Sequence, residues 1–441
     1  MTPSVWRLVF QTRQYLKGSL WFLPLLGGLA GALLGFLEGP IGRAVDEPES
    51  VQYSASTAST VLSAIVGSTA ALTGFVVTVS VLVVQMATDT FSARYMRLWY
   101  RDRMLHVLLA MLVLTFTFSF TLLAGVEEAS VPNVGITATG VLMSVDLFLF
   151  LFFLDRFIHR LRPVAVAALV ARAGRQAFES LVHAARGPDA PEIVREPFER
   201  ADEPTLVVRS PRAGSIQALH GAGLVRFARA HGCTLVLDHA VGDFVPEGAA
   251  VMHVYGGDEA VRSSERRLHG MFALGVERTI EQDPAFAVRI MVDIAIKALS
   301  PAVNDPTTAV QVLNHLGDTL RLIGSTDLEP SPSDRGRPAR VLVPARGWQD
   351  FLALGVTEIR EYGASSLQVV RRLRAVLEEL HGSVRPEHRA AVQDELARLQ
   401  AQVERAFGAS TDLDRAGQAD RQGIGGVPAL ERRDVLEQTI S

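Results

Sequence analysis

Four long apolar stretches, all of them before Arg162, constrain this chain more than any other feature. They are residues 20–41, 60–87, 106–125 and 134–157. A helix needs roughly 20 apolar residues to cross the hydrocarbon core of a bilayer. The first stretch is too long for the apolar part of a signal peptide and has no cleavage pattern, so it is predicted to be retained. The sequence therefore predicts four transmembrane helices in a domain of residues 1–163.

The positions of the basic residues predict the orientation of these helices. Basic residues gather at the N-terminus, in the loop between the second and third helices, and after the fourth helix, whereas the other two loops hold only Arg43 among acids. Loops rich in Arg and Lys stay on the cytoplasmic side. Both termini, and everything after Arg162, are thus predicted to be cytoplasmic. The residues are Arg7, Arg13, Lys17, Arg94, Arg97, Arg101, Arg103, Arg156, Arg160, Arg162, Arg172 and Arg175.

Small residues form ordered faces on two of the predicted helices. Gly27, Gly31 and Gly35 make a ridge at steps of four on the first helix, which lets another backbone approach closely. The second helix places small and polar residues on one face, by steps of three and four. This face either packs against another helix or lines a hydrated path. Its members, the candidate pore-lining residues, are Ser63, Gly67, Ala70, Gly74, Thr78, Val81 and Gln85.

Asp146 lies near the centre of the fourth apolar stretch, within the segment VLMSVDLFLFLFF. A charge that faced lipid at that depth would cost several kcal/mol, so the side chain is predicted to face the helix bundle or water. The spans hold no Lys or Arg near its depth that could neutralise it, since Arg156 lies ten positions away at the end of the fourth stretch. Hydroxyls such as those of Thr73 or Thr115 are its expected neighbours. The sequence leaves open whether Asp146 is a neutral structural group or a functional one.

Most of the charge lies after the fourth apolar stretch, which indicates a soluble region. Strand-like and turn-forming segments predict a cytoplasmic α/β domain over residues 164–330, including a hairpin closed by VGDFVPEG. A linker is predicted at 331–340, a helical region at 341–408, and a tail without fixed structure at 409–441. The predicted fold is thus a membrane helical domain followed by an α/β domain and C-terminal helices.

A dense polar cluster marks the middle of the cytoplasmic region. Asp305 precedes Pro306, the arrangement expected where a helix begins. Hydroxyl and carboxyl groups at such a position either cap the helix or hold an anion through free N–H groups. We also expect the exposed polar turn to lie at a contact, either with another subunit or with the membrane domain. The cluster consists of Asp293, Asn304, Asp305, Thr307 and Thr308.

Several blocks resemble a family of predicted bacterial membrane proteins, the domain of unknown function numbered 2254. They are FSARYMRLWYRDR at Phe91, RFIHR at Arg156, SPRAGSIQAL with VGDFVPEG from residue 210 to 248, and the most specific block, DPAFAVRIMVDIAIKALSPAVNDPTTAV, at 283–310. The resemblance covers roughly residues 10 to 405. It implies a four-helix protein of the bacterial inner membrane with a cytoplasmic domain, but no activity. The family usually carries an aromatic residue where Ser215 stands here.

No pattern of catalytic, cofactor-binding or metal-binding residues is recognisable, so neither an enzyme nor a bound cofactor or metal is predicted. The single cysteine, Cys233, excludes an internal disulfide, and the net charge of −4 gives no basic surface for nucleic acid. The favoured hypothesis is a homo-oligomeric ion channel or transporter that contacts the lipid bilayer and passes ions or small solutes. The alternative is a membrane-anchored sensor or scaffold whose cytoplasmic domain binds a ligand or partner.

Overall fold

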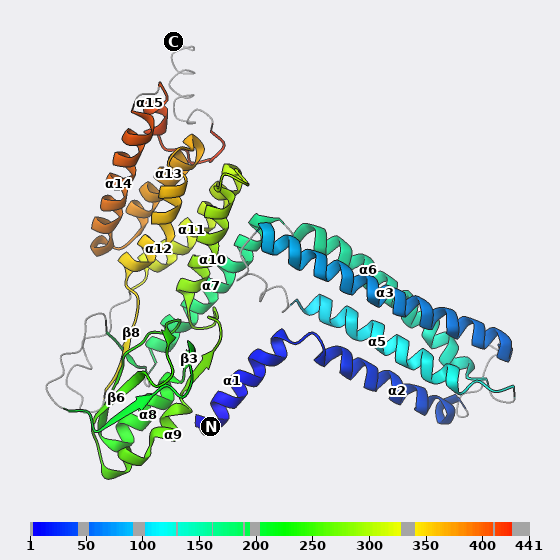
Figure 1. Cartoon of the computed structure of the whole chain (residues 1–441). Helices are drawn as coiled ribbons and strands as arrows, with labels where there is room; N and C mark the ends of the chain where they lie inside the picture. The colour runs from blue at the N-terminus through cyan, green and yellow to red at the C-terminus, as the bar shows by residue number, and fades with distance from the viewer. Residues whose placement is uncertain are drawn as a thin grey trace. The chain divides into compact units, whose positions relative to one another are not determined.

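The fold was obtained as a computed structural model of the whole chain, which divides into two compact units (Figure 1). One unit holds residues 13–162 and contains the apolar helices. The other holds Met1–Thr12 together with Pro163–Ser441. The structure describes residues 3–42, 53–90, 102–128, 131–160, 162–187, 190–194, 203–327, 340–408 and 411–425.

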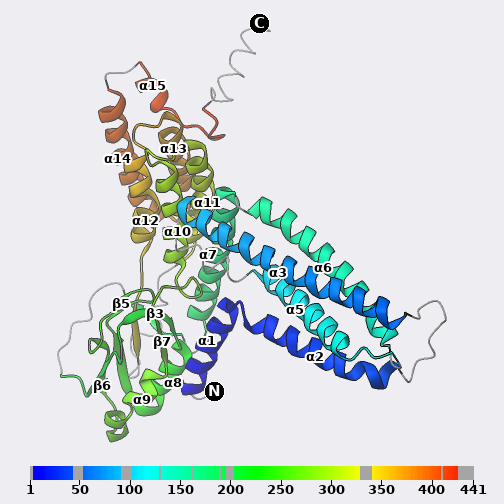
Figure 2. The same cartoon turned by 45° about the vertical axis from the view of Figure 1, so that its right-hand side comes forward.

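The apolar unit is built from long helices that lie side by side (Figures 1 and 2). The third of them, α5, is capped by Asp102, whose carboxylate accepts a hydrogen bond from the Met104 N–H at 2.9 Å. It packs against all three others, so it forms the centre of this unit. The helices are α2 (Phe22–Gly42), α3 (Ala55–Thr90), α5 (Arg103–Ala124) and α6 (Asn133–Arg160).

Three of these helices contain stretches long and apolar enough to cross a bilayer: Ala55–Leu82, Arg103–Ala124 and Asn133–Arg156. Among the described residues, the first apolar helix forms a shorter apolar segment, Phe22–Glu38. The prediction of membrane-spanning helices is therefore confirmed for three of the four expected spans, and the structure leaves the first as a shorter apolar helix.

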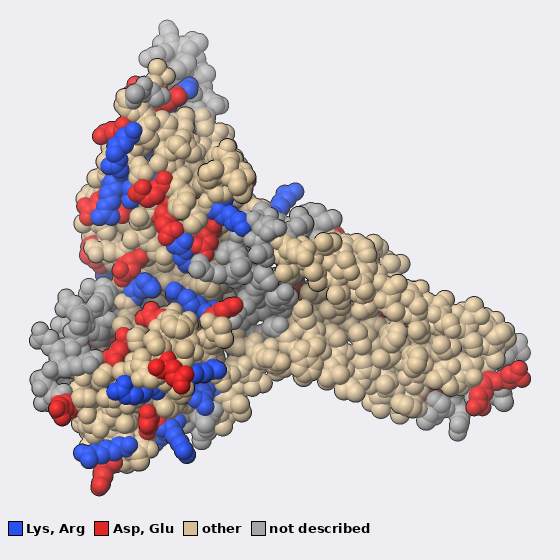
Figure 3. Space-filling view, in the orientation of Figure 1, with Lys and Arg blue, Asp and Glu red and all other residues tan. Residues whose placement is uncertain are grey.

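On the face seen in Figure 3, the apolar unit is almost free of charge along its length, whereas acidic and basic side chains are dense on the other unit. Large apolar side chains point outward from the helices; Phe36 is 76% exposed and Phe148 is 72% exposed. Inside the unit, Leu62, Leu112 and Phe118 are buried in two apolar clusters. A bundle that is apolar both inside and outside suits a lipid environment.

Two small sheets form the first part of the other unit. In the five-stranded sheet, ordered β1-β8-β4-β6-β2, β8 pairs in parallel with β1 and β4, and the remaining pairs are antiparallel. The second sheet is antiparallel, in the order β5-β3-β7. The strands are β1 (Glu192–Val194), β2 (Leu206–Arg209), β3 (Gly214–Leu219), β4 (Cys233–Leu237), β5 (Phe244–Val245), β6 (Ala250–Gly256), β7 (Phe272–Gly275) and β8 (Val341–Pro344).

Helices accompany the sheets and build a bundle beyond them (Figure 2). The bundle helices α7, α10, α11, α12, α13 and α14 pack on one another. The helices of this unit are α7 (Pro163–Ala185), α8 (Gly221–His231), α9 (Glu265–His269), α10 (Pro284–Ala298), α11 (Pro306–Ser325), α12 (Trp348–Tyr362), α13 (Leu367–Ser383), α14 (Arg389–Phe407) and α15 (Leu413–Ala416), with 3₁₀ turns at Glu259–Ser263 and Pro386–His388. Helix α1 (Pro3–Gly18) belongs to this unit up to Thr12 and to the apolar unit from Arg13 on.

The structure adds to the expectations about this unit. The segment VGDFVPEG connects the antiparallel strands β4 and β6, as expected, and in addition Phe244 and Val245 within it form β5 and pair with β3 in the other sheet. The helices of 164–330 and of 341–408 share one bundle, and β8 joins the sheet of the earlier region, because apolar faces on both sides of the predicted linker need each other for burial. Residues 331–339 of that linker lie outside the described residues.

The expected tail without fixed structure, residues 409–441, is ordered over 411–425. Asp420 accepts hydrogen bonds from the N–H groups of Gln422, Gly423 and Gly425, and the side chain of Arg372 donates to the Arg421 carbonyl at 2.8 Å. Polar composition suggested disorder, but these hydrogen bonds fix the segment against α13. Residues 426–441 are outside the described part of the chain.

Candidate functional site

Asp146 lies on α6 and is fully buried, with the Thr115 hydroxyl of α5 beside it. Ser119, one helical turn after Thr115 on α5, is also fully buried. The Thr115 hydroxyl is adjacent to the carboxyl group, yet neither oxygen of Asp146 makes a hydrogen bond of regular geometry to any described residue. The hydroxyl oxygens of Thr115 and Ser119 are likewise without a partner among the described residues. We call these three residues the Asp146 cluster.

Other hydroxyls in the same bundle behave differently. Those of Thr69, Thr117 and Thr139 donate to carbonyls of the preceding turn of their own helix, at 2.8 to 2.9 Å. This local bond is the usual way for a hydroxyl to be satisfied in a membrane helix. Since Thr115 and Ser119 do not make it, the Asp146 cluster holds unused hydrogen-bonding capacity at membrane depth.

The chemistry open to the Asp146 cluster follows from its composition. It offers one carboxyl and two hydroxyl groups, and no Lys or Arg occurs in residues 20–41, 60–87, 106–125 or 134–155. A buried carboxyl group without a basic neighbour has to carry a proton or sit beside a bound cation or water. The cluster can thus bind a proton or a small cation through oxygen atoms.

The glycine ridge of α2 lies against α5. A Cβ atom on Gly31 would fall under 3.0 Å from the Leu114 carbonyl oxygen and the Thr117 hydroxyl, and one on Gly35 would lie 2.6 Å from the Thr121 Cβ. A Cβ on Gly27 would meet the Ala110 carbonyl in the same way. The close approach also allows the Thr117 hydroxyl to donate to the Gly28 carbonyl at 3.1 Å. The glycine ridge is therefore a packing surface between two helices of the same chain.

The small and polar face of α3 is uncovered. All seven candidate pore-lining residues, Ser63, Gly67, Ala70, Gly74, Thr78, Val81 and Gln85, are exposed. No atom would come within 4 Å of a Cβ placed on Gly67 or Gly74. The hydroxyl of Thr78 donates to the Gly74 carbonyl at 2.9 Å, so it is satisfied within the helix. Among the described residues this face has no partner, and it lies apart from the fully buried Asp146.

The cytoplasmic polar cluster is divided between a helix cap and an ion-pair network. Asp305 caps α11, because its carboxylate accepts a hydrogen bond from the Thr308 N–H at 3.0 Å and another from the Thr308 hydroxyl at 2.6 Å. Asn304 takes a left-handed conformation with φ of 46° and is exposed, as is Thr307. The first turn of α11 is thus occupied by its own cap, so nothing in this geometry calls for an anion.

Asp293 is not part of that turn. It pairs with Arg289 one turn earlier on α10, at 2.6 Å, and the same guanidinium reaches Glu358 of α12 at 2.8 Å. These hydrogen bonds raise the pKa of Arg289 above its usual range. The network fastens two helices of the bundle together.

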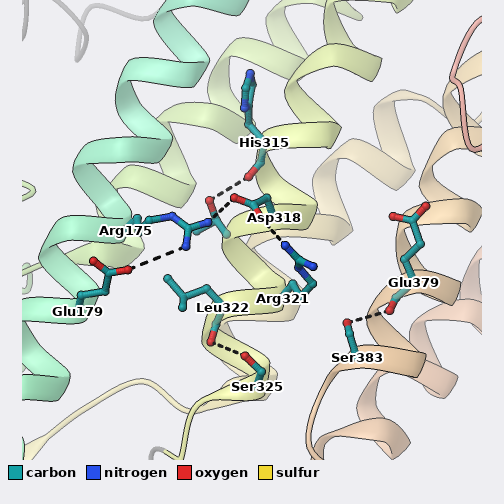
Figure 4. A network of polar contacts seen from close by, with 10 residues as sticks. Arg175, Glu179, His315, Asp318, Arg321, Leu322, Ser325, Glu379 and Ser383 are labelled. Carbon is teal, nitrogen blue, oxygen red and sulfur yellow. Dashed lines mark hydrogen bonds and ion pairs between the residues drawn. The ribbon is translucent and has the colours of Figure 1, made fainter.

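A polar surface cavity between α7 and α11 was not anticipated from the sequence. It has a volume of about 260 Å³. Beside it, Arg175 of α7 pairs with Asp318 of α11, which also accepts a hydrogen bond from Arg321 at 3.0 Å (Figure 4). In the sequence, the spacing of Arg175 and Glu179, one helical turn apart, indicates an ion pair on this face of α7. The lining residues are Phe178, Glu179, Val182, His183, Arg186, Leu322 and Thr326.

Two further observations limit the chemistry of the unit that contains the sheets. Within the described ranges, no three His, Cys, Asp or Glu side chains gather where a metal ion could be held. Cys233 is buried, and burial raises the pKa of its thiol to about 11, which makes it a poor nucleophile.

Comparison with known proteins agrees with the membrane character of the fold. The family model described as "Predicted membrane protein (DUF2254)" matches residues 17–379. The uncharacterized protein MT1328 of Mycobacterium tuberculosis (strain CDC 1551 / Oshkosh) is 30% identical over 418 residues, covering 90% of this chain and 78% of the relative. The uncharacterized proteins Rv1290c of M. tuberculosis (strain H37Rv) and Mb1321c of Mycobacterium bovis are each 29% identical with the same coverage.

No solved structure matches the chain. The family match spans the apolar helices, both sheets and most of the helical bundle. It confirms the resemblance drawn from the NDPTTA block and its companions. The chain belongs to the DUF2254 family of predicted membrane proteins.

Proposed function

We propose that the protein assembles as a homo-oligomer in the bacterial inner membrane and forms an ion channel or transporter whose path is lined by α3. The observation that carries this proposal is the uncovered face of α3, which presents Ser63, Gly67, Gly74 and Thr78 along its length with no described neighbour. The path would pass ions or small solutes. No catalytic role is assigned to any residue.

The physical reason is the difference between packing such a face against lipid and packing it against another helix. Lipid tails gain nothing from contact with glycine and hydroxyl groups, whereas a second helix can approach such a face closely. Closed symmetry is the usual arrangement of identical subunits. Copies of α3 arranged around an axis would place hydroxyls, the Gln85 amide and accessible backbone at the centre. If α3 contacted only lipid, large aliphatic side chains would be expected on this face instead of glycine and hydroxyl residues.

Asp146 has a different role in this proposal. Because it is fully buried between α5 and α6, it does not line the path of an assembled oligomer. Instead, the Asp146 cluster acts as a titratable site within each subunit, where binding or release of a proton changes the packing of α5 against α6. The pH dependence of transport would then come from this cluster.

The decisive experiment compares two glycines that are both open in the single chain. Gly74→Leu places a bulky side chain on the α3 face, and Gly140→Leu does the same on α6, where no atom lies within 4 Å of a Cβ either. We expect Gly74→Leu to lower the oligomer mass measured in nanodiscs and to abolish cation or proton flux in proteoliposomes, and Gly140→Leu to change neither. Equal mass and flux for parent and Gly74→Leu would overturn the proposal.

The orientation and the fourth span belong to the same proposal. We place both termini in the cytoplasm, which requires an even number of crossings and hence that α2 spans the bilayer with α3, α5 and α6. The support is the excess of Arg and Lys in alternate loops. A reporter fused after residue 210 should be active in its cytoplasmic form only, and periplasmic activity would exclude this topology.

The cavity between α7 and α11 favours a second candidate, a membrane-anchored sensor or scaffold. His183 and Arg186 line the cavity at the end of α7, and α7 starts three residues after α6 ends. A ligand there would act on the helix that follows a membrane span. Arg186→Ala would then abolish ligand-induced thermal stabilisation of the purified chain, whereas the channel proposal predicts unchanged flux for this variant.

A further inference from the structure

The N-terminal helix α1 has two distinct faces, and one of them is fastened to the cytoplasmic unit. The Trp6 ring stacks on His220 with centroids 4.9 Å apart and an angle of 12° between the planes. Arg7 donates a hydrogen bond to the His269 carbonyl at 3.3 Å. Both views show α1 beside α8 and α9 (Figures 1 and 2). The first turns of α1 are therefore docked on this unit.

The opposite face of α1 is apolar and exposed. Val5, Leu8, Val9 and Leu16 are all exposed, Leu8 by 64%, and Tyr15 beside them by 62%. Their spacing by three, four, seven and eleven places them along one side of the helix. The described residues leave this side uncovered. A soluble protein rarely leaves such an apolar row in contact with water.

Chain continuity identifies what covers this face. α1 ends at Gly18 and α2 begins at Phe22, so only three residues separate α1 from the first apolar helix of the membrane unit. Three residues reach at most about 10 Å, which keeps the end of α1 at the bilayer surface once α2 has entered it. Exposed Arg13, at the edge of this side, suits lipid phosphates, and Tyr15 and Trp21 are residue types found at this depth.

We infer that α1 is an interfacial helix that lies in the surface of the bilayer, with Val5, Leu8, Val9 and Leu16 among the acyl chains and its Trp6 side on the cytoplasmic unit. A short helix with one apolar side and basic residues binds a lipid surface in this orientation. α1 thereby fastens the α8–α9 surface to the membrane. The inference requires α2 to enter the bilayer but not that the protein conducts ions.

The test uses the full chain in vesicles of phosphatidylcholine and phosphatidylglycerol. An environment-sensitive fluorophore is attached to Leu8→Cys, Leu16→Cys or, as the aqueous control, Val276→Cys, whose native side chain is 90% exposed. Native Cys233 needs no removal, because it is buried and burial raises its thiol pKa to about 11. Accessibility is measured with aqueous iodide and with lipids that carry a nitroxide near the headgroup.

We expect the probes at Leu8 and Leu16 to be quenched strongly by the nitroxide lipid and several-fold less by iodide than the probe at Val276. Iodide quenching equal to that at Val276 would show that the face is in water and would overturn the inference. Protection from both quenchers would also overturn it, since protein, such as a second copy of the chain, would then cover the face. Flux measurements on the same samples report on the channel proposal separately.

Discussion

The contact between α2 and α5 yields the sharpest prediction, because a single hydrogen atom at Gly31 permits it. A Cβ there would lie under 3.0 Å from both a backbone carbonyl oxygen and the Thr117 hydroxyl, whereas ordinary contacts begin at 3.4 Å. The Leu114 carbonyl belongs to a rigid helix and cannot move aside. Gly31→Ala must therefore push the two helices apart by more than about 0.4 Å.

The cost follows from two terms. Overpacking a tight contact costs about 1–3 kcal/mol. Separation also weakens the hydrogen bond from Thr117 to the Gly28 carbonyl, 3.1 Å long, and such bonds between membrane helices contribute about 0.6 kcal/mol. Replacing glycine by alanine within a helix stabilises the helix by about 1 kcal/mol. This gain is the same at a crowded site and at an open site, so it cancels when the two variants are compared. Relative to an open site, Gly31→Ala should thus lose about 2 kcal/mol or more, and Gly31→Leu should lose more still.

Gly140→Ala supplies the matched control, since Gly140 is also in a long apolar helix, has no atom within 4 Å of a Cβ placed on it, and lies outside the α3 face. The free energy of unfolding of both variants would be measured in mixed micelles by titration with a denaturing detergent, followed by circular dichroism. We expect Gly140→Ala to equal or exceed the parent and Gly31→Ala to fall clearly below it. If both variants unfold like the parent, the ridge is not a close contact and the packing argument fails.

Three further predictions concern charged or titratable groups. Asp146→Asn should leave unfolding in detergent unchanged but remove the pH dependence of flux in proteoliposomes; an unchanged pH profile would exclude the proposed titratable site. Asp305→Ala should lower the stability of the unit that contains α11 by about 1 kcal/mol through loss of the α11 cap, measured by thermal unfolding, and an unchanged melting temperature would contradict the capping assignment. Burial, followed by the nearby Arg226, lowers the pKa of His220 below its usual 6.5, and the Trp6 ring of α1 stacks on this imidazole. The α1 docking energy linked to it should be complete above that value and decline as pH falls through the lowered pKa, visible as a change in Trp6 fluorescence that His220→Gln abolishes; docking that is insensitive to acid in the parent would refute it.

The sequence predicted the features that depend on local pattern. Apolar runs identified α3, α5 and α6, since only length and composition are needed to recognise a bilayer helix. The cap of α11 was likewise readable, because Asp305 and Pro306 form a local signal. The close spacing of Gly27, Gly31 and Gly35 predicted a tight helix contact, although not that its partner would be α5 of the same chain.

Features that depend on contacts between residues far apart in the chain could not be predicted in full from the sequence. Asp146 is buried beside Thr115, one of the two hydroxyl residues expected near it, but the sequence could not tell which of the two lies there. That choice depends on the rotation of the helices relative to one another, which helical periodicity alone does not fix. The cavity between α7 and α11 joins residues such as Glu179 and Leu322, far apart in the chain. The ordered segment at 411–425 escaped detection because its stability comes from Arg371 and Arg372 of α13, not from its own composition.

The pairing of β8 with β1 has a consequence for the order in which the protein folds. Arg340, just before β8, forms an ion pair with Glu192 of β1, 148 positions earlier, and β8 separates β1 from β4 in the sheet. Contacts between such distant residues form slowly. The ribosome must release residue 344 before the sheet can close, by which time the apolar helices have long been available for insertion. During synthesis β4 therefore waits with an unpaired edge, a template for aggregation, and a fragment that stops before β8 would keep that edge permanently.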